Sequence, residues 1–185
     1  EAEALKSQFA QAFGDVEKNA QDKLDAISKD TGVAVNRMKA SFTQIAAFSK
    51  TTGASSAEAL NISERAIVAV ADSAAFYDRS IEEVTSSMQS FLKGNYANDA
   101  ALGLSCTETT RNTAANALFS KSFKDLSESQ KQLTLLKMVE DANKTSGALG
   151  QAARESDTWG NQLGNLIQSI KELKETAGST ILKPA

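Results

Sequence analysis

Histidine is absent from this chain of 185 residues, and cysteine and proline each occur only once. Without histidine, the chain lacks the commonest general base and metal ligand of proteins. Cys106 has no second cysteine for an internal disulfide and no histidine to activate it, so we expect no catalytic thiol. Pro184 is the only proline, and no residue before it forces a helix to end. We therefore expect a protein that is not an enzyme and that has no catalytic residue, metal or cofactor.

Charge and hydropathy argue against two further classes. The formal net charge is -3 with both signs interleaved, which gives no signal for binding nucleic acid or an anionic membrane. The longest apolar run, 66–71, ends at Asp72 and is far too short to span a bilayer. No signal peptide is visible. Because the chain begins with Glu1 and not with methionine, we expect it to be a fragment of a longer protein.

The composition favours helices. Alanine, serine, lysine, glutamate and glutamine are frequent, and no stretch alternates apolar and polar residues over a useful length. We predict an all-α, multi-helix bundle with a long N-terminal helix, a C-terminal heptad helix and no β-sheet.

The stretch 62–94 predicts two helices that meet at a turn over Asp78-Arg79-Ser80. Apolar residues repeat at helical spacing before and after this turn, and alanines make the first face flat. Ser80 and Glu83 form a capping-box pattern, and Gly94 is a natural helix stop. Asp72 interrupts the alanine-rich face. It either pairs with Arg65 or Arg79 or points to solvent.

The first fifty residues carry an eleven-residue repeat, which predicts one long helix over 1–52. Its apolar positions are Leu5, Phe9, Phe13, Val16, Ala20, Leu24 and Ile27, and the phase continues through Thr31, Val35, Met38, Phe42 and Ala46. Without a partner along this face, Asp30-Thr31-Gly32 is the expected break, near 31–32.

The remainder, 55–185, is predicted to be one helical domain built on the 62–94 pair. Capping patterns at Ser55 and Ser127 start two helices, and a third runs from Thr107 to about Phe119. Residues 143–150 are expected to form a loop or a loosely wound turn. The C-terminal helix, 155–178, carries a narrow heptad seam that needs a facing helix. The seam positions are Trp159, Leu163, Leu166, Ile170, Leu173 and Ala177.

Two sets of side chains are candidates for function. The clustered carboxylates Asp72, Asp78, Glu82 and Glu83 resemble an acid–base pair or a cation site, but the positive end of a helix dipole explains most of them and is the favoured interpretation. The second set comprises candidate packing or partner contacts: Phe76, Tyr77, Phe91, Trp159, Leu163 and Ile170.

Several segments of the chain resemble the tail tape measure proteins of long-tailed bacteriophages and prophages. The first group of these segments comprises Ala71-Asp72, 74–78, 80–83, Leu92-x-Gly94 and 101–103. The second group comprises Phe123-x-x-Leu126-Ser127-Glu128-x-Gln130-Lys131, 147–150, Trp159-Gly160-Asn161-x-x-Gly164-Asn165-Leu166 and Gly178-x-x-Ile181-Leu182-x-Pro184. Where family members often place an acidic residue after the glycine, this chain has Asn95. The resemblance covers roughly residues 42–185 and is specific in its combination of segments.

The resemblance implies a structural ruler inside the tail tube, which sets tail length and assists tail assembly and genome ejection. It also implies contact with other tail proteins, namely the tail tube and tail assembly chaperones, and a location in the virion tail and, during assembly, in the bacterial cytoplasm. The alternative is a helical interaction or adaptor module, or a surface coiled coil, of bacterial origin. We also expect self-association, because the stripe over 5–42 and the seam over 159–177 have different periods and favour pairing between chains.

Overall fold

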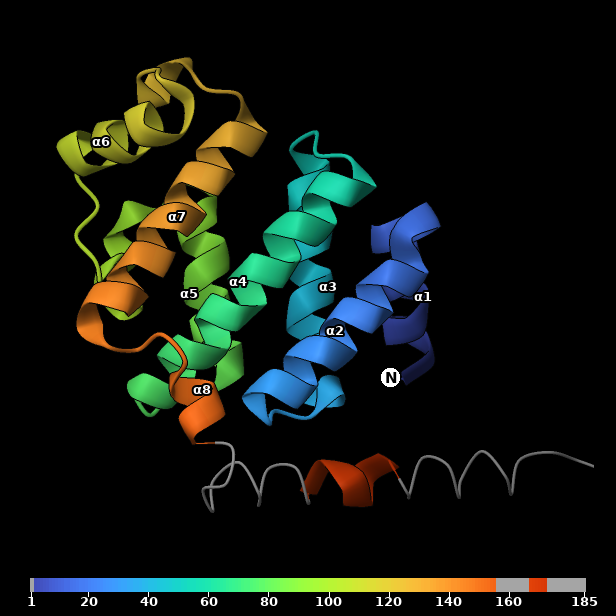
Figure 1. Ribbon diagram of the computed structural model, residues 1–185. Helices are drawn as coiled ribbons and strands as arrows, with labels where there is room; N and C mark the ends of the chain where they lie inside the picture. Colours follow the sequence, from blue (N-terminus) through green and yellow to red (C-terminus); the bar gives the residue numbers. More distant parts are fainter. Residues whose placement is uncertain (1, 156–166, 173–185) are drawn as a thin grey trace, which may run out of the picture.

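A computed structural model of the chain describes residues 2–155 and 167–172, and these residues are helices joined by short connections, without a strand (Figure 1). The all-α prediction is confirmed. The labelled helices are α1 (Ala2–Phe13), α2 (Glu17–Thr31), α3 (Val35–Thr51), α4 (Ser56–Phe76), α5 (Ile81–Leu92), α6 (Glu108–Phe119), α7 (Glu128–Ser146) and α8 (Gln151–Arg154). The 3-10 turns are η1 (Gly14–Val16), η2 (Tyr96–Asn98), η3 (Ala100–Leu102) and η4 (Phe123–Asp125).

The N-terminal segment does not form one long helix; it is interrupted twice. The expected break occurs where α2 ends at Thr31, because Gly32 takes a left-handed φ of +69° that favours glycine. A second interruption at η1 was not predicted. It folds α1 back so that the Phe13 ring lies 5.0 Å from the Phe42 ring of α3. The apolar repeat is still the buried face, but it is covered within the chain.

Helix α4 occupies the centre of the described bundle, with α1, α2 and α3 on one side and α5 and α7 on the other (Figure 1). Its alanines bring neighbouring backbones close. A single core cluster contains residues from the N-terminal helices and from the later ones, among them Phe13, Phe42, Val70, Met88 and Leu135. The helices of residues 2–51 therefore pack into the same core as the segment that follows them.

Local capping starts four of the helices where the sequence predicts. Ser55 and Ser80 each accept a hydrogen bond from the backbone of the glutamate three residues later, and that glutamate bonds back. Thr107 and Ser127 begin α6 and α7 in the same way. Each cap satisfies amide groups that the first helical turn leaves without a partner.

Helix α7 extends into the loop predicted at 143–150. It continues to Ser146, and Asn143 lies inside it with 1% of its surface exposed. The loop proper is therefore short. The chain then forms α8, and residues 167–172 are again helical. Trp159 and Leu163 lie outside the described residues.

Candidate functional site

Asp72 is the most deeply buried carboxylate of those that the sequence singles out. Its side chain is 2% exposed and faces the start of α8. Oδ2 accepts a hydrogen bond from the Gly150 amide at 2.8 Å, and Oδ1 accepts one from the Ala152 amide at 3.1 Å. The predicted alternatives are both wrong, because Asp72 contacts backbone amides and neither arginine nor solvent. Arg65 pairs instead with Glu140 at 2.7 Å, and Arg79 donates to the Ala101 carbonyl at 3.1 Å.

Two further buried side chains extend this contact, and we call Asp72, Ser73 and Asn143 the polar cluster. The Ser73 hydroxyl donates to Asn143 Oδ1 at 3.0 Å, and Asn143 Nδ2 donates to the Ala69 carbonyl at 3.1 Å. The Asn143 carbonyl accepts the Leu149 amide at 2.9 Å. The three buried side chains of the cluster are all hydrogen-bonded, which is the condition for burying polar groups without a large cost. The cluster fastens the end of α7 and the loop after it to α4.

Sequence reasoning missed Asn143. The available signal was an amide at helical spacing from Leu136 and Val139 in an apolar stripe, where an unpaired polar side chain would be unfavourable.

The turn after α4 is held against the turn at η3. If Gly103 carried a Cβ atom, that atom would lie 2.2 Å from the Tyr77 hydroxyl, and Gly103 has a φ of +75°. The positive φ favours glycine there, and a Cβ atom would force the outer end of the Tyr77 side chain to move. Together with the bond from Arg79 to Ala101, this contact joins the segments 74–80 and 101–103.

The remaining clustered carboxylates have structural roles. Glu83 completes the cap of α5, and Asp78 sits in the turn with a φ of +52°. Glu82 is exposed in the first turn of α5. In the part of the chain that the structure describes, no group of three or more Cys, Asp or Glu side chains is arranged to hold a metal ion.

The candidate aromatic and aliphatic contacts divide into two groups. Phe91 is fully buried and belongs to the core. Phe76 and Tyr77 are 39% and 38% exposed, with their rings edge to face at 5.0 Å. Ile170 is 45% exposed on the helical stretch 167–172. The structure thus leaves Phe76, Tyr77 and Ile170 accessible to a partner.

Cys106 is buried, and its thiol lies beside the side chain of Arg111. The guanidinium stacks 4.1 Å from the centre of the Tyr96 ring, and its Nη1 lies 3.8 Å from the Cys106 sulfur. Burial raises the pKa of the Cys106 thiol, and the nearby Arg111 opposes this shift only in part. A raised pKa disfavours the reactive thiolate.

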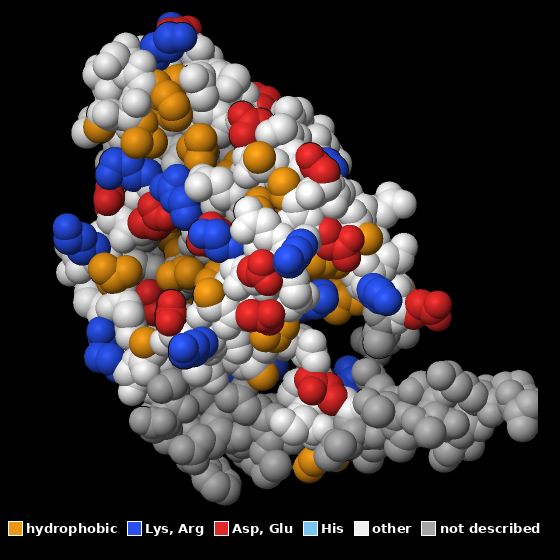
Figure 2. Space-filling model, turned by 45° about the vertical axis from the view of Figure 1, so that its right-hand side comes forward, with side chains coloured by type: hydrophobic (Ala, Val, Ile, Leu, Met, Phe, Trp, Pro, Cys, Tyr) orange, Lys and Arg blue, Asp and Glu red, His pale blue; other side chains and the backbone are white. Residues whose placement is uncertain are grey.

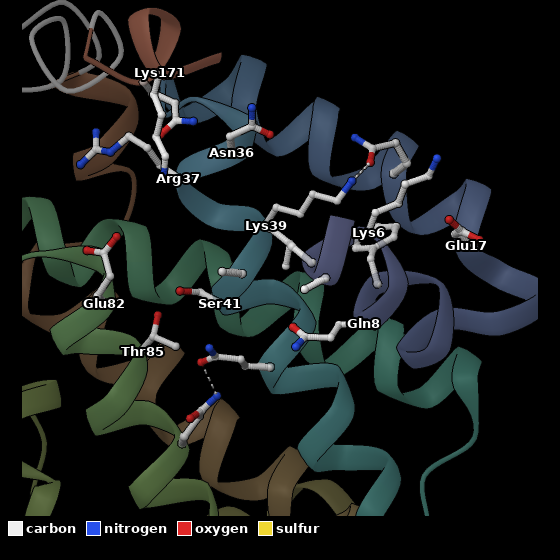
Figure 3. Close-up of a pocket in the computed structure, with 18 of the residues that line it drawn as sticks. Lys6, Gln8, Glu17, Asn36, Arg37, Lys39, Ser41, Glu82, Thr85 and Lys171 are labelled. Atoms are coloured by element: carbon white, nitrogen blue, oxygen red, sulfur yellow. Dashed lines mark hydrogen bonds between the residues drawn. The ribbon is translucent and has the colours of Figure 1, made fainter. Parts of the chain in front are cut away.

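A broad groove runs along α3, between α1 and α2 at one end and α5 and the stretch 167–172 at the other (Figure 3). We call it the basic groove; its volume is about 1170 Å³. Its charged lining consists of five cations and two carboxylates: Lys6, Lys18, Arg37, Lys39, Lys171, Glu17 and Glu82. Six amide side chains also line the groove: Gln8, Gln21, Asn36, Gln44, Gln89 and Gln168. This local excess of positive charge contrasts with the net charge of -3 of the whole chain.

Two polar atoms of the basic groove are buried without a hydrogen-bond partner. They are Nη1 of Arg37 and Oγ1 of Thr85, and Thr85 is 2% exposed. Figure 3 shows Arg37, Thr85 and Glu82 at the same end of the groove. Lys39 differs, because its ammonium donates to Gln21 Oε1 at 2.8 Å and lies 4.2 Å from the Phe9 ring centre. No sequence motif predicts this groove, because its lining residues come from four separate helices and from the stretch 167–172.

Comparisons with protein-family models, curated proteins and solved structures find no match to this chain. Within the described residues, no helix combines the length and apolar character that a membrane crossing requires.

Proposed function

We propose that this chain is a structural segment of a bacteriophage or prophage tail tape measure protein, which sets tail length inside the tube and assists tail assembly and genome ejection. The observation that supports the proposal is that the segments carrying the family resemblance contact one another. Asp72 accepts a hydrogen bond from Gly150 of the segment 147–150, and Tyr77 of the segment 74–78 covers Gly103 of the segment 101–103. Segments far apart in the sequence therefore form one structural unit, as expected if they were selected together for one role.

The helical content fits a ruler. A helix rises about 1.5 Å per residue, so α4 alone, with 21 residues, is about 30 Å long. If residues 2–155 opened into one line of helix, they would span about 230 Å at the same rise. A segment of this kind has a large difference in length between its folded and its extended form.

An in-frame deletion of the codons for residues 2–155 of this chain, made in the gene that encodes it, tests the proposal. Tail length is then measured by electron microscopy of purified particles. We expect tails shorter by about 230 Å if the segment acts as an extended ruler. The intact gene supplied in trans is the control and restores the original length.

Unchanged tails after the deletion would contradict the proposal. The same holds if peptide mass spectrometry finds the chain in the cell envelope and not in particles, which is the result that the bacterial adaptor or surface coiled-coil alternative predicts.

Self-association is part of the same proposal, although its basis changes. The N-terminal stripe is largely buried in its own chain, so of the two apolar stripes it is the C-terminal seam that we expect to pair between copies. Of the seam positions, Ile170 is described, and it is 45% exposed. Ile170→Glu should lower the mass of the full chain in light scattering, because an exposed charge replaces a seam residue.

Ile167→Glu is the matched control, since Ile167 is 60% exposed but lies off the heptad positions. Equal masses for the wild-type chain and both variants would exclude pairing through the seam.

A further inference from the structure

The basic groove has the dimensions of a peptide-binding site. Pockets for small molecules usually have volumes of about 300–1,000 Å³ and enclose most of the ligand. At about 1170 Å³, and open to solvent along its length, this groove is larger and less enclosed. Its length follows α3 and reaches elements at both ends (Figure 3). An elongated ligand fits this shape better than a compact one.

The lining of the groove defines the charge of that ligand. Five cations face two carboxylates, and a third carboxylate, Glu172, is already hydrogen-bonded to Asn36 at the edge. Lys6 and Lys18 are exposed, and Figure 3 shows Lys6 at the end of the groove away from Arg37 and Glu82, so both lysines are available to an incoming anionic group. The amides of Gln8, Gln44 and Gln89 offer donors and acceptors of the kind that a peptide backbone uses.

The buried unpaired atoms point to a ligand independently of the charge. A buried hydroxyl normally has a hydrogen-bond partner, and in helices serine and threonine usually bond the carbonyl four residues earlier. Ser87 follows that rule with Glu83, but Thr85 in the same helix does not. Nη1 of Arg37 also lacks a partner. Both atoms are enclosed by the fold, so oxygen atoms of a bound ligand supply acceptors to them once neighbouring side chains of the groove lining move aside.

A nucleic acid fits these observations less well. The cations are interrupted by Glu17 and Glu82, so the lining offers no continuous row of positive charge for a polyphosphate backbone. Figure 2 shows basic and acidic side chains interspersed over the face it presents, without a continuous basic stripe. An acidic peptide carries separate carboxylates, and each of them can pair with one of the separate cations of the groove.

We propose that the basic groove binds an acidic peptide segment of a partner protein, with Arg37 and Thr85 contacting its side-chain or backbone oxygens. This inference does not depend on the proposed function, because it rests on the groove alone.

Fluorescence polarisation with the full chain tests the proposal. The probe is a labelled peptide of about 15 residues, long enough to be partly helical, with glutamate at every third or fourth position among alanines. We expect binding that weakens at least about tenfold when all glutamates are replaced by glutamine. Binding should also weaken when salt rises from about 50 to about 500 mM, because the pairs are partly exposed.

Two variants test whether the peptide binds in the groove. Lys6→Gln/Lys18→Gln should weaken binding about fivefold, whereas Lys121→Gln/Lys124→Gln, with the same change in net charge on exposed positions outside the groove lining, should not. Thr85→Val should weaken binding while leaving the melting temperature unchanged or higher, because its hydroxyl has no partner in the fold. A loss of stability in Thr85→Val would instead assign the hydroxyl a structural role and contradict its contact with the ligand.

Several outcomes overturn the proposal. One is no binding of the glutamate peptide at about 1 mM and low salt. Others are equal binding of the glutamate and glutamine peptides, or an equal loss in both double-lysine variants. Tighter binding of a single-stranded oligonucleotide than of the peptide would identify the ligand as nucleic acid.

Discussion

Replacing Asp72 by asparagine changes one atom in the contact between α4 and α8. The carboxylate offers an oxygen to each of two amides, those of Gly150 and Ala152. Asparagine keeps one oxygen and turns its amino group toward the other N–H, so one buried donor loses its acceptor. Asn and Asp have similar helix propensities, so the difference between the two proteins reports this contact and not the intrinsic stability of the helix.

The expected loss is about 2–3 kcal/mol. A hydrogen bond to a charged group contributes about 1.5–3 kcal/mol, and a buried donor without a partner adds to the cost of losing it. In a protein of this size, 1 kcal/mol lowers the melting temperature by about 2–4 °C. We therefore expect a decrease of about 4–12 °C. Ala152 is 1% exposed, so this part of the chain should unfold together with the bundle.

Thermal unfolding followed by circular dichroism measures the global effect, and hydrogen exchange at the amides of Gly150 and Ala152 measures the local one. Protection of these amides should fall by about 30- to 150-fold, since each 1.4 kcal/mol corresponds to a factor of ten. Asp22→Asn is the control, because Asp22 is exposed on α2, and should change stability by less than about 0.5 kcal/mol. An Asp72→Asn protein with an unchanged melting temperature and unchanged protection would refute the reasoning.

Three further predictions concern local features. Ser80→Ala should lower the free energy of unfolding by about 1 kcal/mol through loss of the cap of α5, whereas Ser86→Ala, exposed within the same helix, should not; equal urea midpoints for both would contradict this. Gly103→Ala should cost about 1–3 kcal/mol because of its positive φ, and Tyr77→Phe in the same chain should recover part of the loss by removing the nearest atom; an unchanged loss in the double variant would exclude the contact. Cys106 should react with a disulfide reagent at pH 8 at least about tenfold more slowly in the native protein than in urea, because burial raises the pKa of its thiol, and equal rates would contradict its burial. The raised pKa also makes stability depend on pH, because the unfolded chain releases the Cys106 proton at a lower pH than the folded protein does. The contribution of the protonated thiol to the free energy of unfolding is therefore complete below the ordinary thiol pKa, and it is lost as pH rises through the raised pKa of the folded protein.

The sequence by itself determined where four of the helices begin, α4 to α7, but not the starts of α2 and α8. The capping boxes at Ser55, Ser80 and Ser127 are correctly predicted because a capping box involves a residue and its neighbour three positions on, and needs no other part of the chain. The helix start at Thr107 is also correct, although its capping box with Thr110 was not predicted. The apolar repeat of the N-terminal segment also identified the buried face correctly, since helical periodicity persists across a break.

Only the tertiary structure decided what these helices contact. The bend at η1 forms where Phe13 meets Phe42, which is 29 positions away and on another helix. Asp72 finds its partners 78 and 80 residues later in the chain, and Asn143 extends α7 because it bonds α4. The basic groove likewise draws its charges from separate helices. Spacing within a helix specifies which side chains share a face. The partner of a buried polar group is set by the packing of distant segments, because a packing that left these groups buried without partners would lose several hydrogen bonds.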